Sequence, residues 1–307
     1  MSNRQEDLRV PINDRDTLFL KRIRHAERQG PPVLMIHGMM SNGRVFYSHG
    51  GKGLAHFLAR QGYDVFVADL RGKGKSTPRI DADARHGQTE MICEDLPALH
   101  ATVRRLSGDQ PVHWMSHSWG GVLLNSTLLR YPELIDQVAS LVHFAAKRSV
   151  QVRNIHKLIE IDLMWNWVLR GVTRRVGYLP ARRLKFGADN ETNKTHWQIK
   201  RWAKASPWID SDDGFDYGAA ARHTRLPPAL YLAAQNDPCR GHPHDVKRFR
   251  DESGPHVSRV HLLGRRTGYR HDYDHISLLT HPDAAQEHFQ LLLHWLRGHH
   301  DRVPENY

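Results

Sequence analysis

The sequence has few cysteines and no long apolar run, and these two absences exclude several classes of protein. Its two cysteines, Cys93 and Cys239, are far apart and form no CxxC pair, so no disulfide framework is expected. No apolar run is long enough to cross a bilayer, so no transmembrane segment is expected. Residues 1–7 lack an apolar stretch behind a basic start. We therefore expect no signal peptide and a cytoplasmic location.

Acidic residues are in the minority, and the balance of charge bears on the partners of the chain. The 307 residues include 44 Lys and Arg against 33 Asp and Glu, which gives a net charge of +11. This charge suits an anionic surface or substrate, although net charge informs on encounter more than on fold. The basic residues form no long run of the kind found in nucleic-acid-binding arms, so no nucleic-acid partner is predicted. The oligomeric state is left open.

Short apolar runs alternate with segments of helical periodicity along most of the chain. The predicted strands cover residues 8–11, 17–22, 33–36, 64–68, 112–115, 138–144, 229–234 and 257–263. The predicted helices cover 54–60, 90–106 and 284–296, with Pro97 expected to kink the second or to delay its start. This alternation predicts an α/β fold, a doubly wound and mostly parallel sheet with ligands at the carboxyl ends of its strands.

The alternation stops between residues 147 and 225. This segment holds five of the eight tryptophans and a strongly apolar helical stretch around Trp165 and Trp167. We interpret it as a helical cap inserted into a core made of residues 1–146 and 226–307. The tryptophans either form the core of the cap or line a substrate pocket. We predict that Trp165 and Trp167, with Met40 of the core, contact the substrate.

A strand and a helix meet at one tight turn that carries a serine. The apolar run 112–115 precedes Ser116-x-Ser118-x-Gly120, and residues after Gly121 have helical spacing. This is the layout of a nucleophile elbow. Ser116 occupies the position where glycine is usual, and we choose Ser118 as the nucleophile because Ser116 would still lie in the strand. The new helix would also present free N–H groups to a developing oxyanion.

A nucleophilic serine needs a base, and the base needs a carboxylate. His275 lies in the loop after the last predicted strand, where it meets the requirement for the base. Asp237 ends the preceding strand and is the predicted carboxylate. The rivals Asp272 and Asp274 share a loop with His275, and Asp245 lies further along the chain.

The oxyanion hole needs two backbone N–H donors. Trp119 follows the nucleophile and provides the first. Met39 follows His37-Gly38 at the end of the first long apolar strand and is the predicted second donor.

Five motifs in this order resemble the α/β-hydrolase superfamily. They are His37-Gly38-Met39-Met40, Asp69-Leu70-Arg71-Gly72-Lys73-Gly74-Lys75-Ser76, the elbow, Asp237 and Asp274-His275. The resemblance implies a serine hydrolase of the esterase or lipase type, which forms an acyl-enzyme and needs neither cofactor nor metal. Serine at the elbow argues against epoxide hydrolases and haloalkane dehalogenases, which resemble this fold but attack with aspartate.

The expected substrate is a small carboxylic ester with an apolar acyl part. Amide hydrolysis of the proline-iminopeptidase kind and acyl transfer use the same triad and remain alternatives. A metal-dependent enzyme is a second class, because Gly241-His242-Pro243-His244-Asp245 and residues 271–275 could converge on an ion. A binding module without catalysis is a third, which an intact triad argues against.

Overall fold

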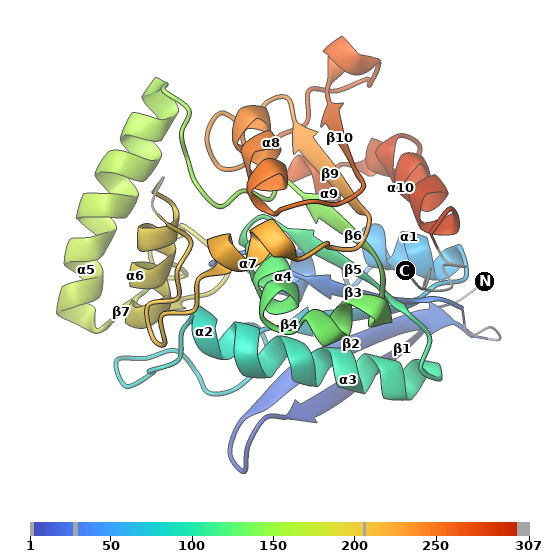
Figure 1. The fold of residues 1–307 in the computed structure, drawn as a ribbon, viewed down its shortest axis with the longest axis horizontal. Coiled ribbons are helices and arrows are strands. Elements are labelled where there is room, and N and C mark those ends of the chain that lie inside the picture. Colours follow the sequence, from blue (N-terminus) through green and yellow to red (C-terminus); the bar gives the residue numbers. More distant parts are fainter. Residues whose placement is uncertain (1–2, 27–29, 205–206, 300–307) are drawn as a thin grey trace.

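A mostly parallel sheet lies at the centre of the protein, as a computed structural model of residues 3–26, 30–204 and 207–299 shows (Figure 1). Over these residues the sheet has eight strands in the order β1-β2-β4-β3-β5-β6-β9-β10. Only the β1–β2 and β2–β4 pairs of this sheet are antiparallel. The strands are β1 (Asn3–Pro11), β2 (Thr17–His25), β3 (Pro32–Ile36), β4 (Asp64–Asp69), β5 (Val112–His117), β6 (Val138–Phe144), β9 (Ala229–Ala234) and β10 (Ser258–Leu263). The predicted fold class is confirmed.

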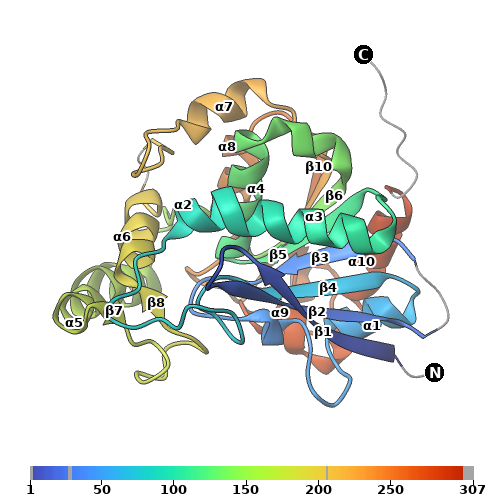
Figure 2. The same ribbon diagram turned by 90° about the horizontal axis from the view of Figure 1, so that it is seen from below.

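Helices cover both faces of the sheet (Figure 2). On one face lie α1, α9 and α10, and on the other lie α3, α4 and α8. The helices are α1 (Leu54–Arg60), α2 (Gln88–Glu90), α3 (Leu96–Ser107), α4 (Trp119–Arg130), α5 (Leu169–Val176), α6 (Asn193–Trp202), α7 (Tyr217–His223), α8 (Pro243–Glu252), α9 (Ser277–Thr280) and α10 (His288–Arg297).

The central strands are apolar because both of their faces are covered. Every residue of β3, β4, β6 and β9 is buried. Side chains alternate between the faces, so Val33 and Met35 pack with α1 and α10 while Leu34 and Ile36 pack with α3 and α4. The near-continuous apolar runs that predicted these strands are the pattern of a parallel sheet buried on both sides.

Two helices differ from the sequence expectation. The segment predicted as one helix over 90–106 contains a π-helical turn, Met91–Asp95, directly before α3. Pro97 then lies in the first turn of α3, where its missing N–H costs nothing. The last helix begins at His288 and not at 284, because Glu287 leaves helical geometry and its carboxylate accepts a hydrogen bond from Arg270 N at 2.8 Å.

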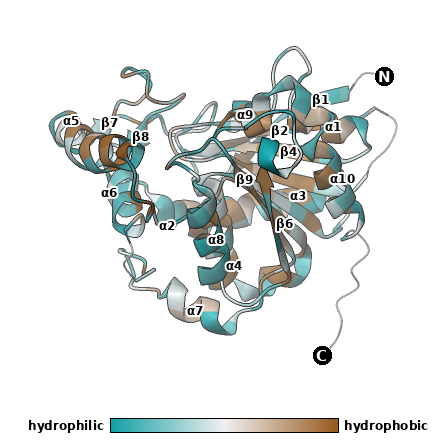
Figure 3. Ribbon diagram, turned by 90° about the horizontal axis from the view of Figure 1, so that it is seen from above, coloured by the Kyte–Doolittle hydropathy of each residue, from teal (hydrophilic) through white to brown (hydrophobic). Residues whose placement is uncertain are grey.

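Residues 147–225 connect β6 to β9 and form the segment that we call the cap. A π-helical stretch, Lys157–Val168, continues into α5. Beside them lie α6 and the ribbon of β7 (Tyr178–Leu179) and β8 (Glu191–Thr192), all to one side of the sheet in Figures 1 and 2. Apolar residues are exposed along the outer helix, as the brown turns near α5 in Figure 3 show.

The cysteines and the lengths of the helices bear on two expectations from the sequence. Cys93 and Cys239 are both free thiols. Across the described part of the chain, no helix combines the length and the apolar character that a bilayer crossing requires.

Candidate active site

The backbone at Ser118 has the strained conformation expected of a nucleophile elbow. Ser118 has φ 53° and ψ −124°, between the end of β5 and the start of α4. A positive φ is unfavourable for a residue with a side chain and persists only where the surroundings enforce it. Here the helix passes very close to the strands, since a Cβ on Gly120 would lie 2.6 Å from the carbonyl oxygens of both Ile36 and His37. The strain holds the serine out at the tip of the turn.

Ser116 occupies the usual glycine position because its hydroxyl has a buried partner. Its Oγ lies 2.7 Å from His143 Nδ1, and the residue is fully buried in β5. The close approach is made by Gly121, where an added Cβ would lie 2.9 Å from both of these atoms. Ser116 therefore belongs to the packing beneath α4, whereas Ser118 lines a cavity.

Asp237 and His275 lie in contact although 38 positions separate them. His275 Nδ1 is 2.6 Å from Asp237 Oδ2. Burial raises the pKa of Asp237, but the His275 imidazole, a backbone N–H of Gly241 and the charge of Lys147 outweigh it, and the net pKa lies below its usual range. The carboxylate thus stays ionised and favours the tautomer of His275 with its proton on Nδ1. Nε2 is then the basic nitrogen of the ring.

The rival carboxylates have other partners. Asp245 accepts a hydrogen bond from Gln151 N at 3.0 Å, and Asp272 accepts one from Arg265 N at 2.7 Å. Asp274 accepts from Ile276 N and Ser277 N, both at 2.8 Å, and so shapes the loop that carries His275.

His117 supports the His275 loop from below. Its Nε2 lies 2.8 Å from the His275 carbonyl oxygen, and the two ring centroids are 4.7 Å apart. Burial lowers the pKa of His117 to about 3, so the ring is neutral and donates its Nε2 proton to that carbonyl. The sequence analysis gave His117 no role, although it directly precedes the predicted nucleophile.

The turn at Met39 and Met40 is held by the cap. Met40 N donates to Glu191 Oε1 at 2.6 Å, and Met40 O accepts hydrogen bonds from Ala188 N at 2.8 Å and from Asp189 N at 3.2 Å. Glu191 is itself buried and forms an ion pair of 2.7 Å with Lys73. These contacts fix Met40 at φ 50° and therefore the direction of the neighbouring Met39 peptide.

The segment 69–76 positions this turn and contains none of the three predicted triad residues. Asp69 accepts hydrogen bonds from Gly43 N at 2.8 Å and Lys75 N at 2.9 Å. His37 Nε2 accepts one from Leu70 N at 3.1 Å, and burial lowers the pKa of His37 to about 4. A neutral His37 thus connects the two strand ends on which the turn is built.

A cavity of about 240 Å³ lies between the core and the cap. Ser118, His275, Met39 and Trp119 line it, so the predicted nucleophile, base and oxyanion-hole residues all face one space. Over the described residues, no hydrogen bond joins Ser118 to His275. Such bonds are often long before substrate binds.

The two tryptophans predicted to contact substrate lie in different environments. Trp165 is 4% exposed and lines the cavity, with Met40 and Phe186 nearby on its wall. Trp167 is 76% exposed on the outer face of the cap and is absent from the cavity lining. The expectation that Trp167 lies in the pocket does not agree with this placement. The intervening stretch is π-helical, so spacings along it differ from those of an α-helix.

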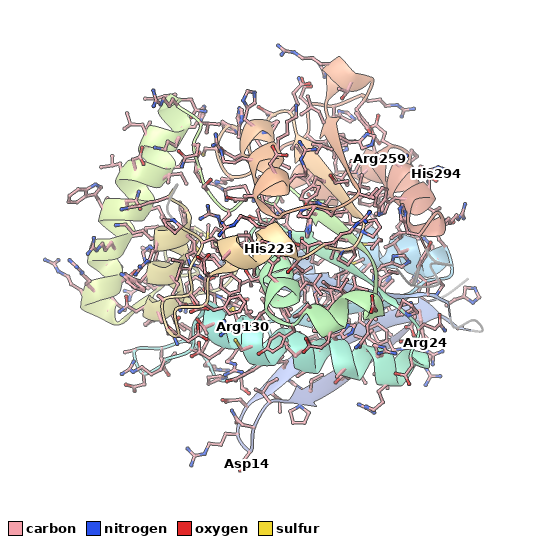
Figure 4. The ribbon with its side chains drawn as sticks, in the orientation of Figure 1. Asp14, Arg24, Arg130, His223, Arg259 and His294 are labelled. Carbon is pink, nitrogen blue, oxygen red and sulfur yellow. The ribbon has the colours of Figure 1, made fainter. Side chains whose placement is uncertain are left out.

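The base of the cap is anchored to α4 through Arg130, which Figure 4 labels. Its guanidinium lies 2.9 Å from the Tyr217 hydroxyl and 3.4 Å from Asp210 Oδ2, and it also pairs with Asp213. Trp202 packs edge to face against both Trp208 and Tyr217, and the three buried rings fill this junction. These tryptophans therefore belong to the core of the cap.

Comparisons with known proteins agree with this architecture. The family described as alpha/beta hydrolase fold matches residues 31–176. The thermophilic esterase from Thermogutta terrifontis superposes with a TM-score of 0.59 at 17% identity, over 96% of this chain and 99% of that one. The chain has the α/β-hydrolase fold.

Curated relatives match only part of this chain. Lipase 1 of Drosophila melanogaster is 29% identical over 166 residues, which are 51% of this chain and 37% of the lipase. Bifunctional epoxide hydrolase 2 of Sus scrofa is 35% identical over 86 residues, 27% of this chain and 14% of the relative. The chain thus spans well under half of each of these proteins.

Over the ranges that the structure describes, the two loops that suggested a metal site do not contribute ligands to one common group. Among the described residues, one group has ligand atoms close enough for an ion: His271, His281 and Asp283. The histidines of 241–245 are not part of it, and His242 Nδ1 instead accepts a hydrogen bond from His244 N at 3.2 Å. The convergence of the two loops on an ion is not found.

Proposed function

We propose that this protein is a serine hydrolase that cleaves a carboxylic ester with an apolar acyl part through an acyl-enzyme intermediate. One observation carries the proposal: Ser118, at the tip of a strained turn, faces the same cavity as His275, and His275 is hydrogen-bonded to the buried carboxylate of Asp237 at 2.6 Å. A nucleophile, a base and a group that orients the base are the three parts that acyl transfer requires.

In the first step, Ser118 Oγ attacks the ester carbonyl while His275 Nε2 takes its proton. The imidazolium is stabilised by Asp237, which remains ionised because its pKa lies below the usual range. His275 then returns the proton to the departing alcohol, which leaves the acyl group on Ser118. Water, activated by His275 in the same way, releases the acid and restores the serine.

The oxyanion formed in each half-reaction needs donors that are already in position. We assign this role to the backbone N–H groups of Trp119 and Met39. Trp119 N lies in the first turn of α4, where backbone N–H groups have no partner within the helix. Met39 is held by the neighbouring Met40 contacts with Glu191 and Asp189.

The acyl part is assigned to the apolar wall of the cavity. Its apolar lining includes Met40, Trp165, Phe186, Ile199 and Ile276. Each methylene group that leaves water for such a wall contributes about 0.8 kcal/mol. The wall therefore favours esters of medium-chain acids over acetate esters.

A fluorophosphonate probe tests the assignment of the nucleophile. The probe is expected to label the wild-type protein at Ser118, as read by peptide mass spectrometry, and to leave Ser118→Ala unlabelled. Ser116→Ala is the matched control, because Ser116 bonds to His143 beneath the elbow and should leave labelling intact. Modification of Ser116, or an undiminished signal from Ser118→Ala, would contradict the proposal.

A substrate panel tests the reaction. Hydrolysis of 4-nitrophenyl esters from acetate to decanoate is expected, with aminoacyl 4-nitroanilides turned over far more slowly. Faster cleavage of the anilides would favour the amide hydrolase over the esterase.

A further inference from the structure

A buried lysine lines the catalytic cavity, and the proposed reaction does not use it. Lys147 follows β6 and is 3% exposed. It lines the cavity together with Ser118 and His275. Its Nζ lies 5.9 Å from the centroid of the Trp119 ring, which places the ammonium beside the residue that follows the nucleophile.

The other charged groups close to the cavity have counter-ions. Arg240 pairs with Glu160 at 2.7 Å, and Lys73 pairs with Glu191 at the same distance. For Lys147, by contrast, no hydrogen bond or ion pair is found within the part of the chain that the structure describes. The ring of Trp119 lies 5.9 Å from the ammonium, and that contact compensates only part of the cost of burying it.

The nearby carboxylates are committed elsewhere. Asp237 is bound to His275 at 2.6 Å, and Asp245 Oδ1 accepts from Gln151 N at 3.0 Å. Burial lowers the pKa of Lys147, and the charges of Asp237 and Asp245 act in the opposite direction without contact. A buried, unpaired cation that faces a cavity is satisfied when a ligand brings the negative charge.

We propose that the substrate of this hydrolase carries a carboxylate that binds Lys147 while the ester carbonyl lies at Ser118. This rests on the proposed function and narrows it to half-esters of dicarboxylic acids and related carboxylate-bearing esters. A carboxylate fits better than a phosphate, because the cavity of about 240 Å³ presents one unpaired cation, while the charged pair on its wall, Arg240 and Glu160, is mutually neutralised. The apolar wall around Trp165 then holds the hydrocarbon between the two ends.

Two matched esters test this inference. The 4-nitrophenyl half-ester of adipic acid carries a carboxylate where 4-nitrophenyl 6-methylheptanoate carries an isopropyl group of similar shape. The measured quantity is the ratio of kcat/KM for the charged ester to that for the neutral ester. In Lys147→Met this ratio is expected to fall by about ten- to a hundredfold, the usual effect of losing a hydrogen bond to a charged group.

Two further variants separate recognition from packing. Lys247→Met removes the same charge from the exposed face of α8 and should leave the ratio at the wild-type value. Lys147→Arg keeps the charge and should retain most of the preference, which covers the case in which Lys147→Met fails to fold. A structural role for Lys147 would lower both rates together and leave the ratio unchanged.

The outcomes are distinct. A ratio that stays constant in Lys147→Met while both esters are still hydrolysed overturns the carboxylate inference and leaves the esterase proposal intact. If Lys147→Met does not fold, a Lys147→Arg variant that folds but has lost the preference for the charged ester overturns the inference in the same way. A wild-type protein that hydrolyses neither these esters nor the neutral panel overturns the proposed function and the inference with it.

Discussion

At the scale of single residues, the carboxylate that contacts His275 is the most exacting test of the triad. Asp237→Asn is expected to lower kcat by up to about four orders of magnitude, the size of the same change in a serine protease triad, because the amide favours the wrong tautomer of the base. The measurement is kcat on the best ester of the panel. Near-UV circular dichroism should show an unchanged fold.

Asp272→Asn is the matched control for that prediction. Asp272 is exposed and, within the described part of the chain, accepts a hydrogen bond only from Arg265 N, so its variant should keep more than half of the activity. The opposite pattern, with Asp272→Asn inactive and Asp237→Asn near normal, would mean that the wrong carboxylate had been assigned.

How far single residues can be predicted from sequence depends on whether their role is local. Ser118 is indicated by its neighbours in the sequence, because the residues on either side of it predict the strand, the turn and the helix. Asp237 and His275 follow from their positions after strands. Lys147 and Glu191 could not be predicted, since what distinguishes them is the presence or absence of a partner from a distant segment.

At the scale of elements, the cap is expected to set chain-length preference through Trp165. In the wild type, each added methylene should raise kcat/KM by roughly fourfold until the cavity is filled. Trp165→Ala removes the wall and should flatten this dependence. The measurement is kcat/KM across the 4-nitrophenyl ester series.

Trp167→Ala serves as the control, because Trp167 is 76% exposed and lies outside the cavity lining. It should keep the wild-type profile. A flattened profile in Trp167→Ala with none in Trp165→Ala would place the acyl site on the outer face of the cap.

The elements themselves differ in how well their sequences specify them. The buried strands were predicted almost to the residue, because apolar runs between turns leave few alternatives. The start of α10 was wrong, since helical periodicity is present from 284 while the chain turns at Glu287 to bond the loop at Arg270. In the cap, the stretch Lys157–Val168 is π-helical, so the 3.6-residue period of an α-helix does not predict which of its side chains share a face.

At the scale of the whole molecule, buried neutral histidines predict an acid-sensitive fold. Within the described chain, burial lowers the pKa of seven of them strongly, to about 4 for His37, His86, His100, His196 and His288 and to about 3 for His117 and His143. In the unfolded chain these rings take up protons below about pH 6.5. The stability present above that pH is therefore lost as the pH falls toward 4.

The size of this effect follows from proton linkage. Each such histidine lowers the free energy of unfolding by up to about 1.4 kcal/mol per pH unit. The summed loss of free energy from the seven histidines exceeds a typical free energy of unfolding, about 5–15 kcal/mol, when the pH falls by roughly two units. Cooperative unfolding is expected between about pH 6 and pH 4.5, followed by near-UV circular dichroism.

Two variants test the origin of that slope. His288→Gln keeps a donor for the Leu278 carbonyl, which lies 2.7 Å from His288 Nε2, and should reduce the pH slope of stability by about one proton. His223→Gln alters an exposed ring on α7, labelled in Figure 4, and should leave the slope as it is. A protein with undiminished stability at pH 4 would contradict the account.

The hydrogen bonds between Met40 and the cap have a consequence for how substrate enters. Residues 188–191 form hydrogen bonds with both the N–H and the carbonyl oxygen of Met40, next to Met39. If these residues swung away to admit an ester, Met40 would lose those partners, and the neighbouring Met39 N–H, the proposed oxyanion donor, would lose its fixed direction. Opening of the cap on this side would therefore abolish the proposed stabilisation of the oxyanion. If the substrate entered on another side, past the outer helix of the cap, the hydrogen bonds of Met40 would stay intact while substrate and product are exchanged.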